Sequence, residues 1–318
     1  MLSFRINSCF KIIIYSGYKP ADQGDKQMSS SNVFQKRPYG KSGDMLSIIG
    51  FGGIVVANQE QSFSNAIVAE AVERGINYFD VAPTYANAEE KLGPALEPYR
   101  KDVFLACKTN QRHRDGAETD WKRSCELLRT DYFDLYQLHG ILSVEKDVDP
   151  IFVKGGVMDM LLEKKKEGRI RHLGFSAHSH EAALTAMERF DFDSALFPVN
   201  FATFYQGNFG QVIFEATEKH GMSRLALKAM AKQHWVEGHP DRETYAKCWY
   251  EPLSDPEIAE LALRWTLSQP ITSALPPGDE KLFRMAMDFG ERFKPITPEE
   301  TQRLQKHANE LNPIFEAA

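Results

Sequence analysis

Gly75-Ile76-Asn77-Tyr78-Phe79-Asp80 is a short, mostly apolar run that ends in a carboxylate, and two later segments have the same form. Val103-Phe104-Leu105-Ala106 leads to Lys108, and Leu135-Tyr136-Gln137-Leu138 leads to His139. Short runs of aliphatic and aromatic residues predict β-strands. Each predicted strand therefore delivers a polar group at its C-terminal end, which is where a parallel α/β barrel places its chemistry.

Strand-like and helix-like segments alternate along the chain from Phe34 onward. Apolar residues recur at spacings of three and four, which predicts helices, over Phe63–Arg74, Ala88–Leu96, Thr119–Leu128, Met158–Glu167, Glu181–Arg189, Phe209–His220 and Pro256–Ser268. Candidate strands lie between them, at 78–80, 103–107, 134–138, 171–175, 194–199, 223–228 and 272–275, and a further strand ends at Gly52-Gly53. This alternation predicts a parallel sheet of eight strands covered by helices.

Two architectures have this alternation: a closed (β/α)8 TIM barrel and an open doubly wound sheet. The doubly wound dinucleotide-binding fold carries G-x-G-x-x-G after its first strand, and Gly50-Phe51-Gly52-Gly53 lacks that spacing. Polar residues also follow several different strands. We therefore predict an α/β fold, a (β/α)8 TIM barrel forming one domain over residues 34–318. A short N-terminal hairpin turns at 41–44, and a C-terminal helix covers Glu299–Leu311 after Thr297-Pro298.

The composition is that of an ordinary globular protein. The 318 residues are 42% hydrophobic, and the formal net charge of −6 has both signs interspersed, so no basic stripe for nucleic acid is present. The four cysteines lie too far apart for a C-x-x-C motif, and we expect reduced thiols in the cytoplasm. His172, His178 and His180 are spaced as histidines commonly are by chance in a strand followed by a polar loop, and we expect no metal site.

Residues 1–33 differ from the rest of the chain and are predicted to be a disordered extension. Phe10-Lys11-Ile12-Ile13-Ile14-Tyr15 contains a lysine and is far shorter than a membrane span, and no small-residue cleavage site follows it. We expect neither a signal peptide nor a membrane partner. Met28 would serve equally well as a start, so the sequence leaves open whether residues 1–27 belong to the natural protein.

The polar groups at the strand ends suit proton transfer to a carbonyl oxygen. Asp80, Tyr85, Lys108 and His139 come from consecutive strands and would face one mouth of the barrel. An ammonium at Lys108 favours the phenolate of Tyr85 and would bring its proton closer to transfer at neutral pH. Asp80 would keep Lys108 charged, and His139 would orient the substrate oxygen. None of the four can donate hydride, so a nicotinamide cofactor must complete the site.

The chain resembles the aldo-keto reductase family, in motifs that follow one another in family order between residues 34 and 290. The matching segments are Ile49-Gly50-Phe51-Gly52-Gly53, Gly75–Asp80 with Ala82 and Tyr85, Leu105-Ala106-Cys107-Lys108-Thr109, Asp134–His139, Gly168–Ser176 and Pro277-Gly278. The resemblance implies that Asp80, Tyr85, Lys108 and His139 are a catalytic tetrad with Tyr85 as general acid. It also implies that NADPH binds across the barrel mouth without a doubly wound fold.

The resemblance also points to residues that would contact the cofactor, namely Gly53, Ser176, Asn200, Lys228, Gly278, Lys281 and Arg284. After Ser176 the family has an asparagine that holds the nicotinamide carboxamide, whereas this chain reads Ala177-His178. We expect Asn200 or His178 to take its place. Where many relatives carry an aromatic side chain that stacks on nicotinamide, this chain would use Lys228 or Met230.

The cofactor's 2′-phosphate would meet a mixed set of charges. Lys281 and Arg284 are the cations near Gly278, and two acids, Asp279 and Glu280, precede them. The family pattern therefore implies NADP, and NAD is not excluded.

We predict an NADP-dependent oxidoreductase that reduces small aldehydes or ketones to alcohols, or runs the reverse reaction. The alternative is a cofactor-binding regulatory or interaction subunit on the same barrel, which would gain nothing from a Tyr85–Lys108 pair. A metal-dependent hydrolase would need an H-x-H pair on the first strand, and Ile48–Gly53 has none. The long stretch 229–256, with Trp235 and Trp249, predicts a lid over the mouth or a satellite apolar cluster. The sequence identifies neither the physiological substrate nor the oligomeric state.

Overall fold

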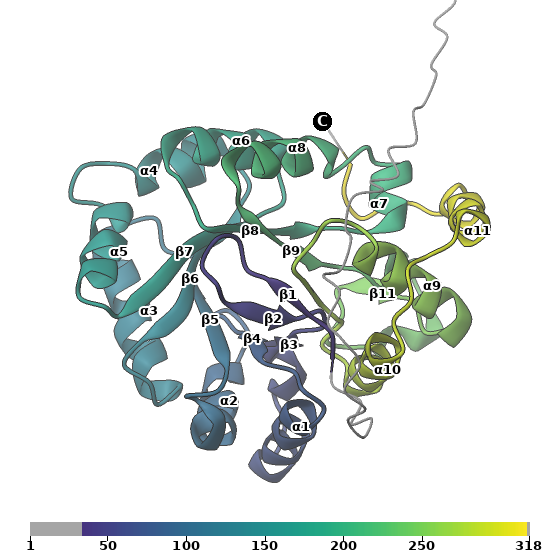
Figure 1. Cartoon of the computed structure of the whole chain (residues 1–318), viewed down its shortest axis with the longest axis horizontal. Helices are drawn as coiled ribbons and strands as arrows, with labels where there is room; N and C mark the ends of the chain where they lie inside the picture. The colour runs from purple at the N-terminus through teal and green to yellow at the C-terminus, as the bar shows by residue number, and fades with distance from the viewer. Residues whose placement is uncertain (1–33, 317–318) are drawn as a thin grey trace, which may run out of the picture. The chain divides into compact units, whose positions relative to one another are not determined.

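The computed structural model describes residues 34–316, and the predicted extension over 1–33 lies outside them. Parallel strands form a single eight-stranded sheet in the order β12-β9-β8-β7-β6-β5-β4-β3. Their bounds are β3 (Phe51–Gly52), β4 (Tyr78–Asp80), β5 (Phe104–Thr109), β6 (Phe133–Ile141), β7 (Ile170–Ala177), β8 (Ser194–Pro198), β9 (Ser223–Leu227) and β12 (Ser273–Leu275). A parallel bridge between Ile49 and Ala274 joins the two ends of the sheet. The predicted (β/α)8 TIM barrel is therefore confirmed (Figure 1).

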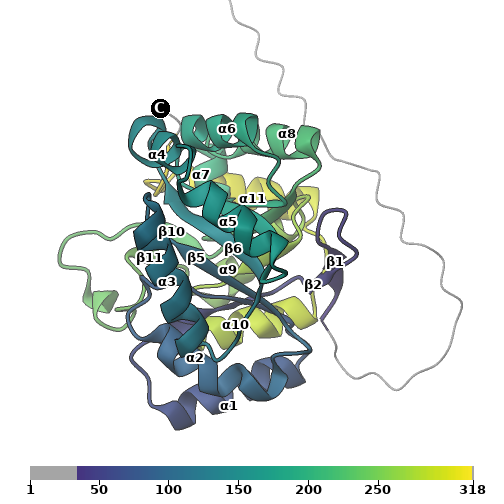
Figure 2. The ribbon, with the colours of Figure 1, turned by 90° about the vertical axis from the view of Figure 1, so that its left-hand side faces the viewer.

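Helices surround the strands on the outside of the barrel, as Figures 1 and 2 show. The α-helices are α1 (Gln61–Glu73), α2 (Ala88–Leu96), α3 (Arg114–Leu127), α4 (Asp149–Ile151), α5 (Val157–Lys166), α6 (His180–Arg189), α7 (Phe201–Tyr205), α8 (Gln211–His220), α9 (Pro256–Leu267), α10 (Glu280–Glu291) and α11 (Pro298–Ala308). Shorter turns are η1 (Gly53–Val56), η2 (Glu97–Tyr99), η3 (Val144–Val148) and η4 (Pro240–Arg242). None of the helices in the described part of the chain is long and apolar enough to span a membrane.

Helix α10 is absent from the sequence prediction, which considered the residues after Gly278 only as cofactor contacts. Asp279 caps this helix, because its carboxylate accepts hydrogen bonds from the backbone N–H groups of Lys281 and Leu282. Buried residues at helical spacing then face the barrel, including Leu282, Phe283 and Ala286. The segment therefore carries an ordinary amphipathic helix signal.

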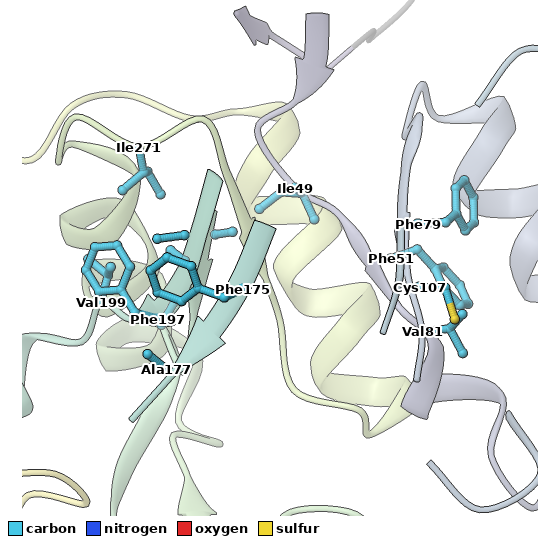
Figure 3. Packing of buried hydrophobic residues seen from close by; sticks show 14 of the residues in the cluster. Ile49, Phe51, Phe79, Val81, Cys107, Phe175, Ala177, Phe197, Val199 and Ile271 are labelled. Carbon is cyan, nitrogen blue, oxygen red and sulfur yellow. The ribbon is translucent and has the colours of Figure 1, made fainter. Parts of the chain in front are cut away.

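Alternation along the strands divides the core into two layers, because successive strand side chains point to opposite faces. The outward layer packs against the helices, and Figure 3 shows part of it: Phe51 and Phe79 stack with ring centroids 5.1 Å apart. The inward layer fills the lower barrel with Tyr39, Leu46, Tyr78, Phe104, Ala106, Leu135, Leu196, Leu225 and Leu275. The barrel interior is therefore packed below the polar residues at the strand ends.

The predicted hairpin is present as β1 (Lys36–Pro38) and β2 (Met45–Ser47), which pair antiparallel. It lies across the end of the barrel where the strands begin (Figure 1), and the Tyr39 hydroxyl donates to Ser194 Oγ at 2.8 Å. Tyr39 and Leu46 join the inward apolar layer. The hairpin thus covers one end of the barrel and leaves the C-terminal ends of the strands for the candidate site.

Candidate active site

The alternation of side chains along β4, β5 and β6 explains why the three strand ends present polar groups together. Inward-facing Tyr78, Phe104 and Leu135 belong to the interior cluster. Two residues further along β4, Asp80 faces inward, and further steps of two bring Lys108 on β5 and His139 on β6 to the same face. The register pairs Asp80 with Ala106 and Lys108 with Gln137, so these groups lie at neighbouring heights.

Asp80 and Lys108 form a fully buried ion pair, with exposures of 1% and 0%. The Lys108 ammonium donates to Asp80 Oδ1 and to the Val81 carbonyl oxygen, the latter at 3.2 Å. Tyr78 OH and Gln137 Nε2 donate to Asp80 Oδ2 at 3.1 and 2.8 Å, which fixes the carboxylate. Burial alone would lower the pKa of Lys108, but the Asp80 carboxylate raises it above its usual value. Lys108 is therefore held in its charged form.

Tyr85 lies above this pair in the loop between β4 and α2. The Lys108 ammonium is 5.3 Å from the centre of the Tyr85 ring. Burial raises the pKa of Tyr85 above its ordinary value, and Lys108 offsets only part of that effect. The sequence argument considered only the lysine and expected a phenol closer to transfer at neutral pH. The structure adds the cost of placing a phenolate in a buried site, so Tyr85 remains protonated at neutral pH.

His139 faces Tyr85 across the mouth, with ring centroids 5.7 Å apart and nearly perpendicular. Burial, together with the nearby Lys108 charge, lowers the pKa of His139 to about 3, so the imidazole is neutral at physiological pH. Thr84 Oγ1 lies 3.3 Å from its Nδ1, and Arg112 Nη2 donates to its backbone oxygen at 2.7 Å. Sequence reasoning missed Thr84 and Arg112; the position of Thr84 directly before Tyr85 was the available signal.

Ser176 and Asn200 stand on the next strand ends around the barrel. Ser176 Oγ accepts a hydrogen bond from the Gly140 backbone N–H at 2.7 Å. Asn200 Nδ2 donates to the backbone oxygens of Lys228 and Ala231 at 3.0 and 2.7 Å, and its Oδ1 accepts from Thr203 N. The Asn200 carboxamide is buried and already bonded to protein groups on both of its ends.

Comparisons with known proteins identify the family of this chain. A sequence profile of the Aldo/keto reductase family matches residues 48–309. The chain belongs to the aldo/keto reductase family. "Uncharacterized oxidoreductase YqkF" of Bacillus subtilis is 27% identical over 310 residues, covering 87% of this chain and 97% of that protein. L-galactose dehydrogenase of Arabidopsis thaliana is 30% identical over 156 residues, covering 44% of this chain and 47% of that protein.

Solved structures extend the likeness to the whole fold. The holo form of aldo-keto reductase AKR11C1 from Bacillus halodurans matches with a TM-score of 0.67 at 23% identity, covering 90% of this chain and 97% of that one. A thermostable aldo-keto reductase, Tm1743, in complex with the inhibitor epalrestat has a TM-score of 0.64 at 18% identity and covers 86% of this chain and 100% of that one. These matches support the barrel fold, and family membership makes the protein an oxidoreductase.

Aldo/keto reductases use nicotinamide cofactors, and two glycines expected to contact one lie where the first and last barrel strands meet. A Cβ at Gly53 would come within 2.7 Å of Val81 Cγ2, and one at Gly278 would clash with Ile54 Cγ2. Packing against neighbouring protein side chains therefore already requires glycine at both positions.

The two expected phosphate-binding cations are on α10. Arg284 Nε donates to Glu70 Oε2 on α1 at 3.0 Å, whereas Lys281 is exposed in the first turn. The Asp279 carboxylate caps the N-terminus of the same helix. An anion approaching this end of the aldo/keto reductase barrel would therefore meet one ion-paired arginine, one exposed lysine and one acidic cap.

Residues 229–256 form a second hairpin with strands β10 (Ala231–His234) and β11 (Tyr250–Pro252). The connection between these strands extends to η1, where Lys247 Nζ donates to the Val55 backbone oxygen at 2.6 Å. Cys248 and Tyr250 also pack with Ile314 in a small cluster of their own. The segment therefore forms the satellite apolar cluster, and the lid over the mouth stays a prediction.

His178 follows β7 and stacks on Phe315, with ring centroids 4.9 Å apart. Burial, with the nearby Lys228 charge, lowers the pKa of His178 to about 4. Its Nδ1 atom is buried and has no hydrogen-bond partner among residues 34–316. No cluster of three or more potential metal ligands occurs in this part of the chain.

Proposed function

We propose that this aldo/keto reductase converts the carbonyl group of small aldehydes or ketones to an alcohol, or catalyses the reverse reaction, with Tyr85 as the general acid. The observation that carries the proposal is the buried Asp80–Lys108 ion pair, whose ammonium lies 5.3 Å from the centre of the Tyr85 ring. A charge pair with exposures of 1% and 0% is costly to bury. Its position beneath a phenol at the barrel mouth gives it a chemical use.

Each member of the set has a defined part in the proposed reaction. Tyr85 donates its proton to the carbonyl oxygen, and Lys108 stabilises the phenolate that remains. Asp80 keeps Lys108 charged and aimed. A bound reduced nicotinamide supplies the hydride, which no side chain in the set can provide.

His139 serves as a neutral hydrogen-bond donor to the substrate oxygen. Its pKa of about 3 keeps a second positive charge away from Lys108 at neutral pH. A hydrogen bond from Thr84 to Nδ1 would leave the imidazole proton on Nε2, where it could reach the substrate. The pair Thr84–His139 therefore orients the carbonyl for proton transfer from Tyr85.

The residues at the mouth fit a nicotinamide group in one specific respect. His178 Nδ1 is buried without a partner in the described structure, and a buried polar atom of this kind gains from a hydrogen bond to a ligand. We propose that His178, beside Ser176, contacts the carboxamide in place of Asn200, whose own amide is bonded to protein groups. Free Cys107, Cys125 and Cys248 support a reducing compartment, and we propose the cytoplasm.

The test of the reaction is turnover of a panel of aldehydes by the purified protein with NADPH and with NADH, followed by cofactor absorbance. Tyr85→Phe is expected to lower turnover by about 10²–10⁴-fold while cofactor binding is retained. Tyr132→Phe is the matched control, because Tyr132 directly precedes β6 at the end of the barrel opposite the candidate site. A protein that binds cofactor but turns over no aldehyde or alcohol would support the alternative of a regulatory or interaction subunit.

We propose NADP as the preferred cofactor, with its 2′-phosphate held by Lys281 and Arg284. The acidic cap at Asp279 and the ion pair of Arg284 with Glu70 oppose this preference. Arg284→Ala is expected to weaken NADPH binding by about tenfold or more and to leave NADH binding nearly unchanged, because the phosphate loses a charge-assisted hydrogen bond. Fluorescence titration of both cofactors measures this. Equal losses would assign Arg284 to the support of α1, and a wild-type preference for NADH would reverse the cofactor assignment.

A further inference from the structure

Lys228 directly follows β9 at the barrel mouth in an unusual backbone conformation. Its φ of 70° lies in the left-handed region, which side chains rarely adopt. Asn200 holds this turn by donating from Nδ2 to the Lys228 and Ala231 backbone oxygens. Strained backbone that is fixed by buried hydrogen bonds tends to occur at functional sites. The position of this lysine is therefore determined by the surrounding structure.

The Lys228 ammonium lies beside two adjoining aromatic rings and pairs with no acid among residues 34–316. Its Nζ is 4.6 Å from the centre of the Tyr250 ring and 5.0 Å from that of Trp249. Ring faces attract a cation but leave its hydrogen-bond donors free. No carboxylate in the described residues forms an ion pair with it, because nearby Glu251 bonds Lys232 Nζ at 2.6 Å and Gln233 Nε2 at 2.9 Å instead.

Burial disfavours the charged form of Lys228. It lowers the pKa of Lys228 to about 8, so the ammonium is still mostly charged at neutral pH. A partly buried cation without a counter-ion is stabilised by any anion that can reach it. The side chain is also not fully covered, which leaves an approach for a ligand.

The ring contacts connect Lys228 to the candidate active site. Trp249 packs against Phe315 with centroids 5.9 Å apart, and Phe315 stacks on His178. His178 is electrostatically coupled both to Lys228 and to His139. An anion bound by Lys228 would therefore belong to a molecule that lies at the same mouth as Tyr85 and His139.

We propose that Lys228 binds the carboxylate of an acidic aldehyde or ketone substrate, which rests on the carbonyl-reducing function proposed above. The Trp249 and Tyr250 rings beside the ammonium offer apolar surface to the carbon chain of such a substrate. This assignment replaces the cofactor contact that the resemblance implies for Lys228. The cofactor phosphates share the chemistry of a carboxylate, but the cations expected to hold the 2′-phosphate are on α10. Lys228 would thus select substrates that carry a negative charge at a distance from the reacting carbonyl.

The test compares acidic and neutral aldehydes of matched shape, namely 4-carboxybenzaldehyde with benzaldehyde and succinic semialdehyde with butanal. Wild-type protein is expected to favour the acid in at least one pair. Lys228→Met should lower kcat/KM for that acid by about ten- to a hundredfold, the worth of a charge-assisted hydrogen bond, with little effect on the neutral aldehyde. Lys228→Arg should retain part of the preference. Lys219→Met, on the exposed end of α8, is the control for loss of one charge.

Two further measurements separate the possible results. Titration of NADPH and NADH should give the same affinity for wild type and Lys228→Met; a selective loss of cofactor binding would assign Lys228 to a cofactor phosphate and overturn the proposal. Calorimetric titration with 4-(hydroxymethyl)benzoate and benzyl alcohol, with and without NADP⁺, requires no turnover. Carboxylate binding that is weakened in Lys228→Met supports the proposal even if no aldehyde is reduced. Equal binding by both proteins, or equal losses for acidic and neutral aldehydes, would refute it.

Discussion

Lys108 and Lys228 occupy comparable places on opposite sides of the barrel mouth and carry their charges in different ways. Lys108 lies one residue before the end of β5 and Lys228 follows β9, with β6, β7 and β8 between them in the ring. The Asp80 carboxylate neutralises Lys108 and raises its pKa. Lys228 has two aromatic rings in place of an acid, and burial lowers its pKa to about 8. One charge is thus arranged to act on a neighbouring side chain, and the other is available to a ligand.

The largest expected difference between the two lysines is in catalysis. Lys108→Met should reduce turnover of a neutral aldehyde by about 10²–10⁴-fold, because the Tyr85 phenolate loses its stabilising charge and proton transfer fails. Lys228→Met should leave that turnover nearly unchanged. Initial rates with benzaldehyde and saturating cofactor measure both. Comparable losses of turnover in the two variants would contradict the assignment of Lys108 to Tyr85 and of Lys228 to a ligand.

Stability should separate the lysines by a smaller amount. Lys108→Met leaves the Asp80 carboxylate buried without a cation and is expected to cost about 3–5 kcal/mol of unfolding free energy. The double variant Asp80→Asn with Lys108→Met should recover much of this stability but no activity. Lys228→Met should change stability by about 1 kcal/mol or less, because weak cation–ring attraction is lost together with a desolvation cost. Urea denaturation measures all three; a large loss for Lys228→Met would contradict the assignment.

The smallest expected effect is a pH dependence confined to one side of the mouth. Lys228 is charged below its pKa of about 8 and neutral above it, so the preference for acidic over neutral aldehydes should fall as the pH rises from about 7 to about 9. The titratable groups beside it keep their state in this range: His178 has a pKa of about 4, Cys248 of about 11, and burial raises that of Tyr250. Turnover of the neutral aldehyde should show no step from His139, whose pKa is about 3. Ratios of kcat/KM across the range test both statements.

The two sides of the mouth also differ in how far the sequence could predict them. Asp80, Lys108 and His139 each lie near the C-terminal end of a largely apolar strand, and the period of two within each strand places them on one face. This information is contained in the local sequence. The surroundings of Lys228 are not, because Trp249 and Tyr250 lie some twenty residues away along the chain and are brought beside it by the pairing of β10 with β11.

The sequence also could not predict pKa values and ion pairs that depend on how the chain packs. Charge alone predicted that Lys108 would lower the pKa of Tyr85, whereas the surrounding protein reverses the net direction. The ion pair of Arg284 with Glu70 joins two helices that are far apart in sequence. Helix α10 did carry a local signal, which was overlooked because the residues after Gly278 were considered only as cofactor contacts.

The junction between the first and last strands makes the barrel a ring with one weak joint. β6 and β7 pair from Phe133 with Ile170 to Ile141 with Ala177, whereas β3 and β12 are linked through the bridge from Ile49 to Ala274. Across this joint the Gly50 N–H donates to the Ala274 carbonyl oxygen and the Ala274 N–H donates to the Ile48 carbonyl oxygen, each at 2.9 Å. Thermal opening of the ring should begin here, where few bonds must break at once. Ile54 packs over Gly278 beside the joint. A methyl group at Gly278 would clash with the Ile54 side chain and push apart the first and last strands of the barrel.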